Sequence, residues 1–194
     1  MPRIPTAIAL AGLLASASAG ALAAPVVYEI DPAHTYPSFE ADHMGLSFWR
    51  GKFNTTSGDV VLDREAQTGT VNITVDVNSV DFGHDKMNEK ARSEELFNTA
   101  EFPQASFAGT LGDFTDGAPT SLRGNLTLNG VTAPVDLAIT HFRCIEHPML
   151  KREVCGADAS GSFQRDAFGL ALGKEYGFDM TVNLRIQVEA LVKP

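Results

Sequence analysis

The chain has 194 residues, of which 44% are hydrophobic and 20% charged, enough for one domain with a substantial core. This composition excludes an intrinsically disordered chain. The 24 acidic and 15 basic residues give a formal net charge of −9, so we expect neutral or apolar partners and no nucleic acid.

Residues 1–23 have the layout of a secretory signal peptide. Arg3 is followed by an apolar run and then by the small residues Ala21-Leu22-Ala23, after which we expect cleavage and export to the periplasm. The alternative, a membrane anchor, is disfavoured because glycines and serines interrupt the run over residues 7–24. No other segment approaches a membrane-spanning length, so we expect residues 24–194 to form a single domain without stable membrane insertion.

In the first part of the remaining chain, apolar and polar residues alternate with the period of two that a β-strand requires. The period predicts strands at residues 26–30, 38–44, 58–63 and 70–80. In residues 45–53, two glycines bracket Phe48-Trp49-Arg50, and we expect a loop or a bent strand at the mouth of a barrel.

One segment departs from this β-pattern. Residues 86–97 are rich in helix formers, with Asp85 placed to cap the N-terminus and Pro103 beyond the end. The apolar stripe of this segment is thin, so we expect a helix that lies on the surface of the barrel.

Strands then follow at hairpin spacing, at residues 106–111, 121–128, 133–142, 157–165 and 178–190. The last has the clearest pattern, because every second residue from Phe178 to Ala190 is apolar and every residue between them is polar. Long amphipathic strands favour a closed barrel, since closure removes the edges that they would otherwise expose. The expected fold class is all-β, a closed antiparallel eight-stranded barrel with one inserted surface helix.

An eight-stranded barrel can be filled by its own side chains or can hold one small ligand. Several positions on the apolar faces are small, among them Ala41, Gly124 and Ala159, which favours a narrow apolar tunnel over a packed interior. Such a tunnel in an exported protein implies a lipophilic ligand. The residues expected to face the ligand are Phe39, Ala41, His43, Ile73, Val75, Phe107, Leu126, Leu137, Ile139, His141, Phe163, Arg165, Met180, Val182, Leu184 and Ile186.

Three of these residues are polar. His43, His141 and Arg165 share the apolar faces of their strands and fall near the strand ends, where a tunnel would open. Each of them taken alone fits a satisfied side chain of the core or rim. Together they could contact the polar head of a ligand.

The two cysteines, Cys144 and Cys155, are separated by ten residues. In an exported protein this pair is most simply a disulfide that closes a local loop. A redox or metal-binding pair is the alternative, but the chain has no CxxC and no second cluster of ligands. We therefore predict no metal site, and no motif predicts a cofactor.

Several long segments resemble one known family. They are YEIDPAHTYPSFEADHMGLSFWRGKF, SVDFGHDKMNEKARSEELFNTAEFPQASF, LTLNGVTAPVDL and CGADASGSFQRDAFGL, which together are similar to the YceI-like family of bacterial exported lipid-binding proteins over about residues 28–190. The resemblance implies a lipocalin-like barrel in the periplasm that holds an isoprenoid-type or fatty amphiphile along its axis, without catalysis. The family more often has RxDFG where this chain has Ala167 between Asp166 and the Phe, which leaves the role of Asp166 open.

Two other functions are compatible with parts of the pattern. A small outer-membrane barrel has the same alternation, although the inserted helix and the few Trp and Tyr residues disfavour it. An enzyme could act on a lipophilic substrate with His43 or His141 as acid or base, but no nucleophile or orienting partner is evident. The sequence does not decide between a monomer and a homodimer, nor between transport, storage and sequestration.

Overall fold

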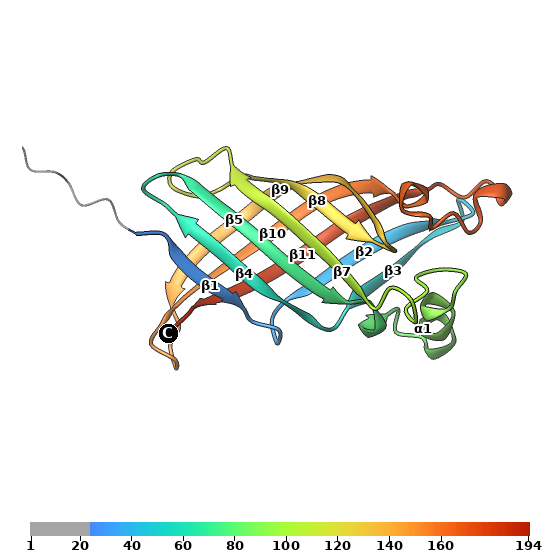
Figure 1. The fold of residues 1–194 in the computed structure, drawn as a ribbon, viewed down its shortest axis with the longest axis horizontal. Coiled ribbons are helices and arrows are strands. Elements are labelled where there is room, and N and C mark those ends of the chain that lie inside the picture. Colours follow the sequence, from blue (N-terminus) through green and yellow to red (C-terminus); the bar gives the residue numbers. More distant parts are fainter. Residues whose placement is uncertain (1–23) are drawn as a thin grey trace, which may run out of the picture.

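Eleven strands in residues 24–194 form one continuous sheet that closes into a barrel in the computed structural model of the protein (Figure 1). The structure describes residues 24–194, and the predicted signal peptide, residues 1–23, lies outside the described residues. The strands are β1 (Val26–Ile30), β2 (Tyr36–His43), β3 (Ser47–Phe53), β4 (Thr56–Asp63), β5 (Thr68–Asp76), β6 (Val80–Asp81), β7 (Gln104–Gly112), β8 (Ser121–Leu128), β9 (Val131–Glu146), β10 (Glu153–Gln164) and β11 (Thr181–Val192).

The eleven strands fill eight positions around the ring of the barrel, and we call each position a stave. Three staves are each built from two consecutive strands, and the other five from one strand. β1 and β2 pair one after the other with β11, β4 and β3 pair with β1 and β2, and β6 extends the stave of β5 by pairing with β3. The strands β7 to β11 supply one stave each, and the pairing of β1 with β11 closes the ring. Neighbours in the chain are thus neighbours in space, and the predicted closed eight-stranded antiparallel barrel is confirmed.

The strand predicted at residues 70–80 is wrong in its last part. β5 ends at Asp76, and the short 3-10 helix η1 (Val77–Ser79) follows it. The Asp76 carboxylate accepts a hydrogen bond from the Asn78 N–H at 3.0 Å, and the Ser79 hydroxyl donates one to the Asp76 carbonyl at 2.6 Å. These local bonds offer the backbone an alternative to the strand ladder.

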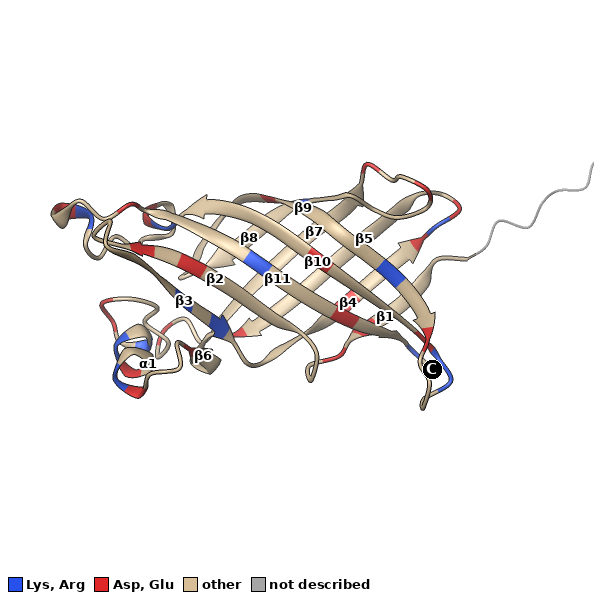
Figure 2. Cartoon of the chain, turned by 180° about the vertical axis from the view of Figure 1, so that it is seen from behind, with Lys and Arg blue, Asp and Glu red and all other residues tan. Residues whose placement is uncertain are grey.

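The helix α1 (Asp85–Arg92) lies beside one end of the barrel (Figure 1, Figure 2). The predicted surface helix is present, but both of its predicted ends are wrong. His84 is the N-cap, because its ring nitrogen accepts a hydrogen bond from an N–H of the first turn, and Asp85 is already helical. The helix ends at Arg92 rather than at residue 97, because Ser93 leaves the helical conformation and caps the last turn.

The apolar faces of the strands point into the barrel and the polar faces point outward. On β11, Val182 and Ala190 are buried, whereas Arg185 and Glu189 are exposed. Figure 2 shows charged positions spread along the strands of the barrel wall. No helix in residues 24–194 is long and apolar enough to span a membrane.

Cys144 on β9 and Cys155 on β10 form the predicted disulfide, with an S–S distance of 2.03 Å. The two residues lie directly opposite each other in the β9–β10 pairing, with their Cα atoms 4.0 Å apart. The crosslink therefore ties the two longest neighbouring strands together at one end of the barrel.

Candidate ligand cavity

A cavity of about 570 Å³ occupies the interior of the barrel and is lined by residues of all eight staves. Its wall is dominated by aliphatic and aromatic side chains, such as Phe39, Val182 and Leu184. The volume lies within the range of roughly 300–1,000 Å³ that is usual for small-molecule sites. The barrel is thus hollow, and its interior suits a long apolar molecule.

Only some of the small residues on the apolar faces open this cavity. Gly109 and Gly124 lie opposite each other on β7 and β8, and the ring of Phe107 covers both of them. A Cβ atom at Gly124 would lie 2.6 Å from that ring and 2.5 Å from a backbone oxygen of β7. These glycines therefore make room for a neighbouring side chain, whereas Ala41 and Ala159 lie at the cavity wall itself.

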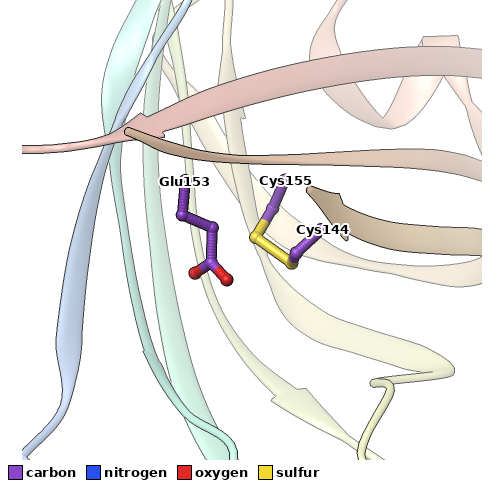
Figure 3. Close-up of side chains that lie close together, drawn as sticks. All are labelled: Cys144, Glu153 and Cys155. Carbon is purple, nitrogen blue, oxygen red and sulfur yellow. A yellow bond between two sulfur atoms is a disulfide. The ribbon is translucent and has the colours of Figure 1, made fainter. Parts of the chain in front are cut away.

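One end of the cavity, which we call the closed end, lies next to the disulfide. Tyr28 lines the cavity there and is only 2% exposed. Its hydroxyl donates a hydrogen bond to Glu153 Oε1 at 2.5 Å, and Arg64 Nη2 donates to the same carboxylate oxygen at 2.6 Å. Figure 3 shows the Glu153 carboxylate beside the bond between Cys144 and Cys155. Covalent and polar contacts thus seal this end.

The closed end changes the acidity of its own groups. Burial, together with the hydrogen bond to Glu153, raises the pKa of Tyr28. Burial of Glu153 raises the pKa of its carboxyl. The hydrogen bonds that the carboxylate accepts from Arg64 and Tyr28 outweigh this effect, so the pKa of Glu153 is lowered overall. Glu153 is therefore a carboxylate at neutral pH, and its charge holds the Arg64 side chain across the end of the barrel.

The opposite end, which we call the mouth, lies between the β2–β3 turn and the segment that joins β10 to β11 (Figure 1). The ring of His43 stacks on Trp49 with centroids 4.3 Å apart and meets the edge of Phe178 at 5.4 Å. Trp49 is 38% exposed and Tyr176 is 71% exposed, although both line the cavity. The mouth thus presents aromatic surface to solvent and gives the cavity its route to the outside.

Arg165 lies at the mouth, in the 3-10 helix η2 (Arg165–Phe168) that follows β10. Its side chain is buried, and its guanidinium donates hydrogen bonds to the Leu170 carbonyl at 2.6 Å and to the Leu172 carbonyl at 2.8 Å. Burial lowers the pKa of Arg165, although nearby carboxylates act in the opposite direction. The guanidinium is therefore a cation held in a largely apolar wall.

Fourteen of the sixteen residues that the sequence predicts as ligand-facing line the cavity. They are Phe39, Ala41, His43, Ile73, Val75, Phe107, Leu126, Leu137, Ile139, Phe163, Arg165, Val182, Leu184 and Ile186. They come from β2, β5, β7, β8, β9, β10, η2 and β11, so the period of two places residues from seven of the eight staves around one space.

The predicted positions of His141 and Met180 are wrong. The β9–β10 register shifts between Asp158 and the next residue, so the face of β9 changes after Ile139 and His141 points outward. Phe142 lines the cavity in its place. Met180 is buried but does not line the cavity, because it precedes β11 and its carbonyl accepts the backbone N–H of Arg165.

Sequence reasoning missed the residues that line the mouth from outside the strands. Met87 and Lys90 on α1, Phe97 after it, and Leu172 and Tyr176 in the β10–β11 segment all line the cavity. Strand periodicity carries no signal for them, because they lie in helical and irregular segments. The thin apolar stripe of the helix is the only feature that could have indicated its contact with the cavity.

Within residues 24–194, two groups of side chains bring three possible metal-ligating atoms within 4.8 Å of one another. One consists of Glu153 and the two cysteines, whose sulfur atoms are already joined to each other. The other consists of Asp31, His34 and Glu189, in which His34 Nδ1 and Asp31 Oδ2 are 2.8 Å apart. The hydrogen bond that His34 Nδ1–H donates to the Asp31 carboxylate raises the pKa of His34, which favours an ion pair of these two residues over a neutral imidazole ligand.

Comparisons with known proteins agree with this architecture. A protein of Shewanella putrefaciens designated UPF0312 is 39% identical over 128 residues, which cover 66% of this chain and 67% of the relative. A UPF0312 protein of an Enterobacter species is 38% identical over 164 residues, or 84% of each chain.

Two solved structures show the same fold. The YceI protein of Campylobacter jejuni aligns with a TM-score of 0.67 at 22% identity, over 78% of this chain and 90% of that one. A domain of Saccharophagus degradans, described as polyisoprenoid-binding, aligns with a TM-score of 0.60 at 17% identity, over 87% and 99% of the two chains. A family model described as YceI-like domain matches residues 28–190. The chain therefore belongs to the YceI-like family.

Proposed function

We propose that the protein binds one long lipophilic molecule along the axis of its barrel and acts in the periplasm after cleavage of residues 1–23. The ligand class is an isoprenoid-type lipid, such as a quinone, a polyprenol or a similar amphiphile, that the protein carries, stores or sequesters. The apolar cavity of about 570 Å³ is the observation that supports this proposal. The polyisoprenoid-binding description of the Saccharophagus degradans domain is consistent with it.

The energy of such binding can come from the tail alone. Each buried CH₂ group contributes about 0.8 kcal/mol, so roughly ten of them contribute about 8 kcal/mol, which corresponds to a micromolar dissociation constant. A cavity with few polar groups therefore suffices for useful affinity. Selection among tails would be modest, since apolar contacts are not directional.

The other two functions find less support in the geometry. An outer-membrane barrel needs apolar side chains on its outside, whereas here Val182 and Leu184 face inward and Arg185 is exposed. An enzyme that used His43 needs a partner to orient the imidazole. The His43 ring is held by Trp49 and Phe178 rather than by a carboxylate.

A blocked cavity tests the proposal. Ala157 lines the cavity, and Ala157→Phe fills part of it; Ala138 is exposed on the outside of β9, so Ala138→Phe is the matched control. Titration with a polyprenol or a quinone, followed by calorimetry, should show binding to the natural protein and to Ala138→Phe, and binding about tenfold weaker or more to Ala157→Phe. Equal binding to all three proteins would place the ligand elsewhere and refute the proposal.

A further inference from the structure

Arg165 is a buried cation without an acidic partner. Its side chain is 8% exposed and its guanidinium has five N–H donors, of which two bind the carbonyls of Leu170 and Leu172. Among residues 24–194, the structure gives this guanidinium no ion pair and no further hydrogen bond. Carbonyl oxygens supply hydrogen bonds but not the negative charge that a buried cation requires.

The nearby carboxylates are engaged elsewhere. Asp166 forms an ion pair with Lys174 at 2.6 Å. Asp42 and Asp179 each accept hydrogen bonds from backbone N–H groups of their own turns. These acids raise the pKa of Arg165 from a distance, against the larger lowering effect of burial. The local structure therefore holds the acids away from the guanidinium instead of pairing them with it.

Arg165 also differs from the other basic residue at the cavity wall. Lys90 of α1 lines the same mouth, but its ammonium group forms an ion pair with Glu95. Among the described residues, Arg165 is thus the one lysine or arginine of the cavity wall that has no ion pair. It stands where the cavity meets solvent, while the opposite end of the cavity is sealed at Tyr28.

We propose that Arg165 is the head-group site of the cavity and that it recognises an anionic oxygen head, a carboxylate or a phosphate, on a long apolar tail. An anion would supply the charge that the buried guanidinium lacks, and the planar fork of the guanidinium matches two oxygens of either group. The tail would then run toward Tyr28. This inference rests on the proposed function and narrows its ligand class to anionic amphiphiles.

The experiment compares ligands with equal tails and different heads. Trp49 is the only tryptophan of the chain and lines the mouth, so its fluorescence reports binding directly. Palmitate is compared with hexadecanol and with hexadecyltrimethylammonium, and farnesyl phosphate is compared with farnesol, each below the concentration at which it aggregates. The two anions distinguish a carboxylate head from a phosphate head. We expect at least one anion to bind about tenfold more tightly than the alcohol with the same tail.

Two substitutions locate the effect. Arg165→Gln should abolish the preference for the anion while the affinity for the alcohol changes less than about threefold, and Arg165→Lys should retain part of the preference. Arg185→Gln removes the same charge from the exposed face of β11 and should leave the preference unchanged. A merely structural role of Arg165 would weaken binding of alcohol and anion equally, because both tails use the same cavity.

Each outcome decides the question. A natural protein that binds palmitate and hexadecanol equally, and farnesyl phosphate and farnesol equally, overturns the head-group proposal but leaves the proposed function intact. Tighter binding of the cationic amphiphile also overturns it. If none of the amphiphiles binds but a quinone or a polyprenol does, the head-group proposal fails and the proposed function stands. If the quinone and the polyprenol do not bind either, the proposed function itself fails. If Arg165→Gln does not fold, the preference of the natural protein and the response of Arg165→Lys still decide the proposal.

Discussion

At the closed end, the disulfide joins the neighbouring strands β9 and β10, the hydrogen bonds of Glu153 with Tyr28 and Arg64 connect β10 to parts of the barrel with which it does not pair, and the cavity-lining side chains there are buried. At the mouth, by contrast, Trp49 and Tyr176 line the cavity and remain partly or largely exposed. The difference separates two tasks within one barrel. We assign stability to the closed end, and we assign entry and release of the proposed ligand to the mouth, where side chains are less constrained.

Removal of the disulfide is the largest test of this contrast. Cys144→Ser combined with Cys155→Ser should lower the free energy of unfolding by about 3 kcal/mol, because the crosslink no longer restricts the unfolded chain. Urea denaturation measures the loss, and a reducing agent should produce the same loss in the natural protein. The affinity for an apolar ligand should change less than about threefold. An unchanged stability would contradict the role assigned to the closed end.

A smaller effect is expected from Glu153→Gln. The substitution removes the charge that binds Arg64, and because Glu153 is partly exposed the loss should be about 1 kcal/mol. Folding lowers the pKa of Glu153, so its contribution is present above the ordinary glutamate pKa of 4.5 and disappears as the pH falls below that value. Denaturation at pH 7 and at successively lower pH should therefore show the variant and the natural protein converging in acid. A constant difference down to pH 2 would exclude the ion pair as the cause.

Substitutions at the mouth should change ligand affinity more than they change the stability of the protein. Trp49→Ala should weaken the binding of a long apolar ligand about fivefold, or roughly 1 kcal/mol, because apolar contact area is lost at the cavity opening. The free energy of unfolding of this variant should change by less than about 1 kcal/mol. Phe48 on the same strand is exposed and does not line the cavity, so Phe48→Ala is the control. Calorimetry that gave equal affinities for the two variants would show that Trp49 does not contact the ligand.

The smallest change is predicted for Tyr176→Ala. Tyr176 is exposed and lies in the short 3-10 helix η3 (Lys174–Tyr176), so the stability should remain within about 0.5 kcal/mol of the natural value. The ring stands at the cavity opening, and its loss should increase the dissociation rate of a bound lipid about threefold. Stopped-flow exchange against a fluorescent competitor measures that rate. A slower release would mean that the ring does not restrict the mouth.

The fold could be predicted from the sequence because the strands alternate in a single phase over long segments. On β11, the period of two places Val182, Leu184 and Ile186 on the cavity side, as the structure confirms. The same argument fails on β9, where one irregular step in the pairing after Ile139 moves His141 to the outside. Such a step leaves no mark in the alternation of residue types.

The mouth of the candidate site was less predictable than its walls. Arg165 could be placed at the end of its strand, but its burial depends on the carbonyls of Leu170 and Leu172, in a segment without periodicity. The sequence pattern counts Gly124 of β8 among the small residues that leave free space, whereas the ring of Phe107 covers it. Both facts concern the direction that one side chain takes over nearby backbone, which the alternation of residue types does not encode.

Native mass spectrometry tests the central claim most directly. The protein, expressed with its own N-terminal segment and purified without detergent from the periplasm of a bacterial host, should carry the added mass of one lipid. Ala157→Phe should lose that mass, and Ala138→Phe should keep it. A natural protein with the mass of the bare polypeptide, and with no uptake of added quinone, polyprenol or farnesyl phosphate, would contradict the account.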